Sequence, residues 1–271
     1  MRYDFLYSFH YDGDELPLAI KRLQYSINSI INQNVNVCVC NTSKTDIWDY
    51  LTIFNNIRYV HEPILRNFTK AKTINLGVKR IVRTPYFFLS DIDLIYPPNY
   101  IKYFNDKYIN LMELGPIRVI NFVNNLGKDL FSTNFEDYNQ AVNKGNVDRN
   151  YRDRRRNWFG VAPGNGLIHR KSFFMIRGYD EDLPGKYGCE DVLFNDRIQF
   201  INKYIEDSDI NLRLIHMFHG FNGDYKDKSY ILNQKLWKSR RAILHNKFNA
   251  DNKFVVKEHL KYIQANQDII W

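Results

Sequence analysis

The 271-residue sequence contains no run of about 20 apolar residues, the length that a membrane-spanning helix requires. Residues 1–4 lead directly into a strand-like segment, without the apolar core of a signal peptide. Cysteine is rare, and the three present, Cys38, Cys40 and Cys189, do not form a disulfide framework. From these absences we expect a protein of the reducing cytoplasm.

Glycine is scarce in the first part of the chain, where Gly13 is the only one before Gly77. A nucleotide-sugar pyrophosphorylase needs a glycine-rich phosphate loop after its first strand. The sequence therefore argues against that class of enzyme.

Acidic residues are outnumbered, because 38 Lys and Arg face 30 Asp and Glu, a net charge of +8. This excess favours phosphates, acidic glycans, anionic lipids or nucleic acid as partners, although a surface charged only for solubility would look the same. The C-terminal part, with Trp237, Arg240 and Arg241, suits RNA and an anionic membrane equally well. It has no recognisable nucleic-acid motif, so nucleic acid is the least expected partner. Peripheral contact with the inner face of a membrane stays an alternative.

Apolar periodicity over the first 90 residues alternates between strand and helix. Continuous apolar strands that alternate with amphipathic helices predict an α/β fold, with a mainly parallel sheet covered on both faces. Ligands of such sheets bind beyond the carboxyl ends of the strands. The predicted strands are 4–9, 35–40, 57–60 and 86–89, and the predicted helices cover 20–30 and 71–82.

The second half is less regular. We expect a strand at 116–123, a long polar loop at 124–157 and a strand at 212–215. Helical spacing of Phe194, Ile198, Ile201 and Ile205 predicts a helix over 190–205. No segment reads as a linker that divides the chain.

An acidic pair follows the predicted strand 86–89. Side chains at i and i+2 of a strand point the same way, so Asp91 and Asp93 can converge at the carboxyl edge of the sheet. A hard divalent cation suits such carboxylates and can bridge them to a diphosphate. Most D-x-D sequences are solvated turns, and here the position after a buried strand makes the functional interpretation an equal alternative.

Two further groups have chemistry to offer. His216 and His219 can present imidazoles to one metal, or one of them can be a buried structural histidine. Glu190 and Asp191 open a predicted helix, where acids also simply stabilise the helix dipole. In that place Asp191 would stay ionised and able to accept a proton from a hydroxyl.

Taken in order, these segments resemble the β-1,4-galactosyltransferase-like enzymes and, more loosely, bacterial chondroitin-type polymerases and other family-2 transferases. The similarity rests on several motifs between about residues 5 and 220: FTKAKTINLG at 68–77, FLSDIDLI at 88–95, Gly164-Asn165-Gly166, FFMIRGY at 173–179, YGCEDVLFN at 187–195, and the closing His216 and His219.

The resemblance implies a GT-A fold and transfer of a sugar from a UDP-sugar, with Mn²⁺ or alternatively Mg²⁺ as cofactor. It implies a catalytic domain over 1–225, with a nucleotide-binding half at 1–95 and an acceptor-binding half at 96–225. A basic helical extension over 226–271 would pack on this domain. The acceptor would be a glycan or lipid-linked glycan, and the net charge of the chain suits an anionic one.

The family's donor and metal roles carry over position by position. Asp93 matches the metal-binding acid, and His219 matches the metal-binding histidine. His216 stands where some relatives have a methionine ligand. The donor would be bound by the remaining matched residues, namely Asp46, Lys70, Asp91 and Gly164.

The acceptor side follows in the same way. Glu190 would contact the sugars, Asp191 would deprotonate the acceptor, and Tyr187 replaces a tryptophan that stacks on the acceptor. The loop at 144–158 is either a solvated charged loop or a lid whose Trp158 covers the donor sugar. Its arginines, 152 and 154–156, suit an acidic acceptor.

Departures from the family leave the sugar open. Cys189 replaces a glycine, and Val161 stands where galactosyl enzymes have a bulky aromatic, which leaves room for an N-acetylhexosamine as well as a hexose. The sequence offers no covalent nucleophile, so a single inverting displacement is expected. The rival interpretation is a catalytically inactive module that binds carbohydrate or a polyanion.

Overall fold

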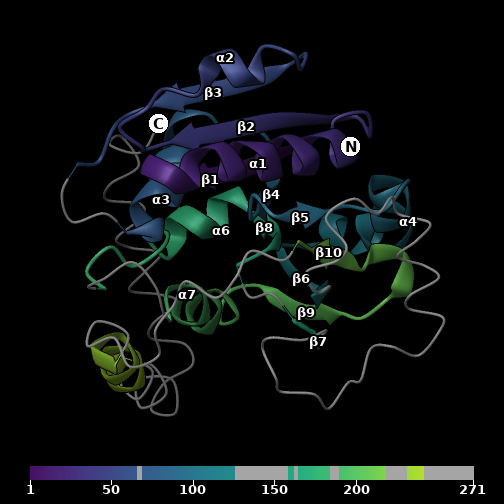
Figure 1. Cartoon of the computed structure of the whole chain (residues 1–271). Coiled ribbons are helices and arrows are strands. Elements are labelled where there is room, and N and C mark those ends of the chain that lie inside the picture. Colours follow the sequence, from purple (N-terminus) through teal and green to yellow (C-terminus); the bar gives the residue numbers. More distant parts are fainter. Residues whose placement is uncertain (66–68, 126–157, 162–163, 184–188, 218–230, 241–271) are drawn as a thin grey trace.

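The structure is a computed structural model that describes residues 1–65, 69–125, 158–161, 164–183, 189–217 and 231–240 (Figure 1). A mixed sheet runs through the molecule and carries helices on both faces. In the described residues, no helix has both the length and the apolar character needed to cross a membrane.

The first half of the sheet is parallel, as predicted. Strands β1 (Tyr3–Phe9), β2 (Val35–Asn41), β3 (Ile57–His61) and β4 (Tyr86–Ser90) lie in the order β3-β2-β1-β4. The connections contain a 3₁₀ turn (Gly13–Glu15) and the helices α1 (Leu16–Ile30), α2 (Trp48–Leu51) and α3 (Lys70–Arg80). The four predicted strands and two predicted helices of this half are confirmed.

The second half continues the sheet with mixed pairing. Strand β8 (Gly166–His169) lies antiparallel between β4 and β6 (Ile117–Asn125). Strand β6 pairs in parallel with β9 (Lys203–Asp207) and β10 (Leu214–His216), and antiparallel with β7 (Trp158–Val161). Strand β5 (Leu94–Ile95) closes the order β3-β2-β1-β4-β8-β6-β10-β5. The other described elements up to residue 217 are α4 (Tyr100–Leu114), α6 (Arg170–Met175), α7 (Glu190–Ile198) and a 3₁₀ turn (Ile210–Leu212).

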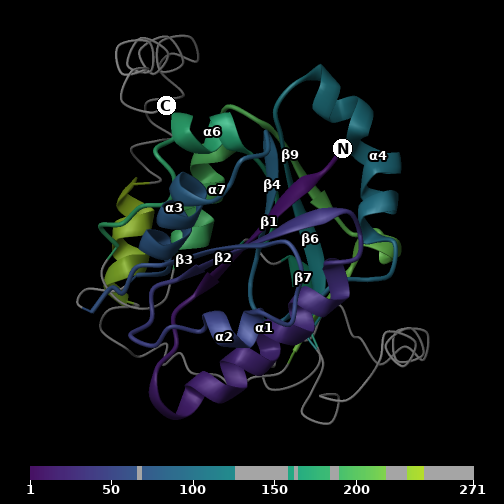
Figure 2. The same ribbon diagram turned by 90° about the horizontal axis from the view of Figure 1, so that it is seen from above.

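Alternation along β1 divides the core into two layers. Tyr3, Phe5, Tyr7 and Phe9 pack with α1, α2 and α4, whereas Leu6 packs with α3, α6 and α7 on the other face (Figure 2). A Cβ added at Gly77 would lie 2.7 Å from Leu6 Cδ1. Glycine therefore lets α3 approach the sheet closely, and because α3 follows the parallel strand β3, its first residue lies towards the sheet's carboxyl edge.

The predicted helix over 190–205 is wrong beyond Ile198. The chain turns there, and the amide of Lys203 donates to the carbonyl of Pro116 at 3.1 Å, which starts the pairing of β9 with β6. Ile205 happens to fit a helical spacing, yet it belongs to this strand. Pairing with β6 decides the structure here, and a local pattern carries no information about that partner. The predicted strand at 116–123 is confirmed as β6.

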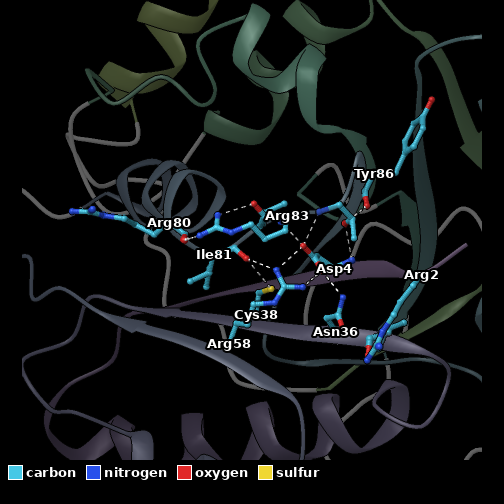
Figure 3. A network of polar contacts seen from close by, with 12 residues as sticks. Arg2, Asp4, Asn36, Cys38, Arg58, Arg80, Ile81, Arg83 and Tyr86 are labelled. Carbon is cyan, nitrogen blue, oxygen red and sulfur yellow. Dashed lines mark hydrogen bonds and ion pairs between the residues drawn. The ribbon is translucent and has the colours of Figure 1, made fainter. Parts of the chain in front are cut away.

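At the amino edge of the sheet, the buried carboxylate of Asp4 connects several strands by hydrogen bonds (Figure 3). Asp4 is fully buried and accepts hydrogen bonds from Arg58, Asn36 and the amides of Arg83 and Thr84, at 2.5–3.0 Å. Burial opposes ionisation of Asp4, but these donors outweigh it and hold the pKa of the carboxyl below its usual value. The network joins β1 to β2, β3 and the turn after α3, at the end of the sheet opposite the candidate site.

Residues 231–240 form a helix beside α7. Trp237 Nε1 donates to Asp196 Oδ2 at 2.8 Å, and Arg240 forms an ion pair with Asp180. This is the described part of the extension expected at 226–271, whose other residues lie outside the described ranges. The domain boundaries at residues 95 and 225 stay predictions.

Candidate functional site

Several polar side chains gather at the carboxyl ends of β1, β2 and β4. His10 Nδ1 lies 2.9 Å from the carbonyl oxygen of Thr42, and the hydroxyls of Thr42 and Thr73 are 2.7 Å apart. Thr73 belongs to the first turns of α3, which starts beside Asp91. None of these three residues is predicted from sequence. Their only signal is that His10 and Thr42 directly follow predicted strands.

Lys70 is the first residue of α3, and its position follows from a helix cap. The Thr69 side chain accepts a hydrogen bond from the amide of Lys72, as capping threonines do. Lys70 Nζ then lies 2.7 Å from Asp91 Oδ1 and 3.5 Å from Asp191 Oδ2. The ammonium thus joins the first acid of the D-x-D sequence to the acid at the start of α7.

Neighbouring carboxylates stabilise the positive charge of Lys70. Burial acts against it, but the carboxylates of Asp191, Asp91 and Glu190 together raise the pKa of Lys70 well above its usual value. Lys70 is therefore an ammonium at any pH near neutrality. Its side chain keeps about a fifth of its surface exposed, with a relative accessibility of 21%.

Asp91 is also held from a second side. Asn165, which is 1% exposed, accepts a hydrogen bond from the Asp91 amide at 2.8 Å and donates one to Asp91 Oδ2 at 3.2 Å. Asp91 therefore faces Lys70 and Asn165. Sequence motifs indicate residue 165 only as part of a short glycine-containing segment.

Asp191 is enclosed by glycine and an aromatic ring. A Cβ added at Gly164 would lie 2.8 Å from Asp191 Oδ2 and 2.9 Å from Oδ1, so a side chain at this position would displace the carboxylate. Burial, and next the negative charge of Asp191, raise the pKa of the Tyr179 hydroxyl well above its usual value. Helix α7 starts after Cys189, whose φ is +67°. Gly164 and the start of α7 together fix the place of this carboxylate.

Asp93 and His216 meet through backbone pairing. His216 of β10 pairs with Leu94 of β5, and the Met217 amide donates to the Asp93 carbonyl at 2.8 Å. Asp93 Oδ2 and His216 Nε2 consequently lie 3.4 Å apart, with Asp93 only 6% exposed. A carboxylate and an imidazole are both groups that bind divalent metal ions.

The predicted three-way convergence around one cation is incomplete. In the ranges that the structure describes, no three His, Cys, Asp or Glu side chains are grouped as metal ligands. Asp91 contacts Lys70 while Asp93 contacts His216. His219, the other predicted ligand, lies outside the described residues.

Asp46 lies farther out along the same edge. It accepts hydrogen bonds from the Tyr59 hydroxyl at 2.7 Å and the Trp48 amide at 2.9 Å, and its Oδ2 is 3.6 Å from His61 Nδ1. Burial slightly opposes ionisation, but the bond from Tyr59 and the other donors lower the pKa of Asp46. Tyr59 and His61 are new members of this group, placed there by β3.

The remaining predicted residues are placed only in part. Glu190 opens α7 and adds to the negative field at Lys70. Trp158 lies in β7, where it pairs with Asn125, and nothing is described of its side chain. Tyr187 and residues 144–157 lie outside the described ranges.

Comparison with known proteins identifies the fold. No protein-family model and no curated protein sequence matches the chain. Among solved structures, S. aureus TarS matches with a TM-score of 0.56 and 13% identity over 80% of this chain, and its 1–349 fragment with 0.52 and 12% over 80%. GalNAc-T7, crystallised with UDP, GalNAc and Mn²⁺, matches with 0.55 and 11% over 88%.

These similarities show the fold and not the chemistry, because the identities are low. The chain spans 37% of TarS, 60% of the fragment and 48% of GalNAc-T7. The chain has the GT-A fold of these glycosyltransferases, as its sequence motifs predicted.

Proposed function

We propose that the protein is an inverting, metal-dependent glycosyltransferase that moves a hexose or N-acetylhexosamine from a UDP-sugar to a hydroxyl of a glycan or lipid-linked glycan. One observation carries the proposal. Lys70 joins Asp91 to Asp191 at the carboxyl edge of a GT-A sheet, with Asp93 and His216 paired on the neighbouring strands. The donor diphosphate and the acceptor hydroxyl would thus bind next to the same cluster of charged side chains.

The donor would occupy the edge between Asp46 and Asp93. Asp46, Tyr59 and His61 offer hydrogen-bonding groups for a nucleoside. Asp93 and His216 would hold the divalent cation, which stabilises the charge that develops on the departing diphosphate. GalNAc-T7, a protein of the same fold, was crystallised with both UDP and Mn²⁺, and this supports the pairing of donor and metal proposed for the present chain.

Asp191 is the proposed base. It would accept the proton of the acceptor hydroxyl while that oxygen forms a bond to the anomeric carbon and the bond from this carbon to UDP breaks. Gly164 leaves the carboxylate its place beside Lys70. Because one displacement exchanges the two bonds on opposite faces of the carbon, the configuration inverts.

Lys70 has two proposed roles in this mechanism. Its ammonium would contact the diphosphate, and it also reduces the repulsion between the carboxylates of Asp91 and Asp191. Glu190 would contact sugar hydroxyls next to the base. Tyr187 and Trp158 are proposed to border the acceptor and the donor sugar.

The test is a panel of UDP-sugars with Mn²⁺, in which slow UDP release without acceptor is measured for each sugar. We expect one donor to raise the melting temperature only when Mn²⁺ is present, and EDTA to remove the effect. Affinity for UDP that is indifferent to chelation, together with no UDP release, would instead show an inactive binding module.

The base is tested by Asp191→Asn with Asp106→Asn as control. Asp106 is an exposed acid of α4. We expect Asp191→Asn to abolish transfer while donor binding persists, and Asp106→Asn to behave as wild type. Normal transfer by Asp191→Asn would reject the assignment.

A further inference from the structure

Among the residues that the structure describes, Arg118 is the largest fully buried side chain, and no step described above uses it. It lies in β6, with its guanidinium between that strand, β8 and α7. Its Nε donates to Asn195 Oδ1 at 3.1 Å, and its Nη1 donates to the carbonyls of Val119 at 3.1 Å and Leu167 at 3.0 Å. Burying a guanidinium is costly, so its retention calls for a reason other than stability.

The place for this side chain is built into the sheet. Gly166, at the start of β8, has a φ of +102°, and a Cβ there would lie 2.1 Å from the Val119 carbonyl oxygen and 3.2 Å from Arg118 Nη1. Both the backbone angle and the space demand glycine. The same residue therefore lets β8 reach β6 and leaves room for the guanidinium.

Through Asn195, Arg118 is connected to the proposed base. Residues four apart in a helix lie on one face, so Asn195 stands one turn behind Asp191 on α7. Asn195 is 6% exposed and faces the sheet. The hydrogen bond from Arg118 to Asn195 therefore restrains the first two turns of α7, which carry Asp191.

The charges of this region also act on one another. Burial lowers the pKa of the Arg118 guanidinium, while Tyr179, Tyr204 and Asp191 act in the opposite direction. Tyr179 stacks on Phe194 of α7, with 4.2 Å between the ring centroids. After burial, the charges of Asp191, Arg118 and Lys70 act on the pKa of its hydroxyl. Lys70, Tyr179 and Arg118 therefore each interact electrostatically with Asp191, and Asp91 and Glu190 act on the same lysine.

We propose that Arg118 is a positioning residue for Asp191, because its hydrogen bond to Asn195 fixes the orientation of the helix α7 that carries this carboxylate. The inference rests on the proposed function, because it concerns the same base. It predicts that catalysis depends on Arg118 much more than folding does.

The experiment compares Arg118→Lys, Arg118→Met and the double variant Arg118→Met with Asn195→Leu. The double variant replaces both partners by apolar groups, which limits the loss of stability that one unsatisfied partner would cause. Asp4→Asn serves as the control, because it removes a buried polar contact at the opposite end of the sheet. Melting temperature, kcat and donor KM are measured for each.

We expect both methionine variants to lose about 100-fold in kcat, as displaced catalytic groups do, with donor KM nearly unchanged. Arg118→Lys, which keeps the charge, should recover part of kcat. Asp4→Asn should melt at lower temperature but keep its kcat. If kcat follows melting temperature across all four variants, Arg118 is structural only and the inference fails.

Hydrogen exchange separates this inference from the proposed function. Amides 193–198 of α7, which donate within the helix, should exchange faster in Arg118→Met than in the wild type, whereas Asp4→Asn should leave them unchanged. Unchanged exchange in Arg118→Met rejects the positioning role even if the enzyme is active. A wild type that releases no UDP from any donor rejects the proposed function, and the exchange result then decides the role of Arg118 in holding α7.

Discussion

Replacement of Lys70 by methionine tests the centre of the site. Methionine keeps most of the side-chain length and removes the charge, so Asp91 and Asp191 lose the ammonium at 2.7 and 3.5 Å. A diphosphate would then approach the carboxylates of Asp91, Asp191 and Glu190 without the ammonium between them. We therefore expect UDP binding to weaken.

The magnitude follows from the geometry. A hydrogen bond to a charged group contributes about 1.5–3 kcal/mol. The three side chains are between a fifth and a third exposed, with values of 21, 30 and 23%, so solvent screens part of this. We therefore take the lower half of this energy range, which corresponds to an increase of about 10-fold to 40-fold in the dissociation constant for UDP.

The assay is calorimetric titration of UDP at saturating Mn²⁺, with Lys70→Arg as the matched control that keeps the charge. Lys70→Arg should bind UDP within about threefold of wild type, since guanidinium also pairs with carboxylate and phosphate. Wild-type affinity in Lys70→Met would refute the role of this ammonium at the diphosphate.

Three further predictions concern separate features. Because its pKa is lowered in the fold, Asp4 stabilises the protein fully above the usual carboxyl pKa, and this contribution is lost as the pH falls from there through the lowered pKa. Asp4→Asn should therefore lower the free energy of urea unfolding by about 3 kcal/mol at pH 7 and by less at pH 3. Gly164→Ala should lower kcat about 100-fold, because its methyl group displaces the Asp191 carboxylate, with little change in UDP affinity. Cys38 and Cys40 should stay unmodified by iodoacetamide at pH 8 in mass spectrometry, because burial raises the pKa of each thiol to about 12.

Each of these has a contradicting outcome. If wild type and Asp4→Asn differ in unfolding free energy by the same amount at both pH values, ionisation of Asp4 does not contribute to folding stability. Unchanged kcat in Gly164→Ala would mean that the carboxylate can move without penalty. Rapid alkylation of either buried thiol in the native state would show that β2 opens readily.

The parts of the fold that local pattern decides were predictable. Continuous apolar strands and amphipathic helices located β1 to β4, α1 and α3, and the strand–helix order then placed the site at the carboxyl edge. The acids Asp91 and Asp191 were found from motifs, and both lie at this edge next to Lys70.

What depends on partners far away in sequence could not be predicted. Residues 203–207 form a strand because β6 offers an edge, and β8 is inserted antiparallel between β4 and β6. Asn165 and Arg118 matter through contacts that cross 74 and 77 residues of chain. A single sequence shows such residues only as ordinary polar positions.

The short strand β5 has a consequence for how a cation site is specified. Leu94–Ile95 is the whole strand, and its pairing with β10 brings Asp93 and His216 together. A slip of one residue in this ladder would turn the imidazole to the other face of the sheet. Affinity for the proposed metal should therefore be sensitive to changes that touch no ligand, such as a proline in place of Ile95, because the alignment of the two main chains sets the distance between the two proposed ligands.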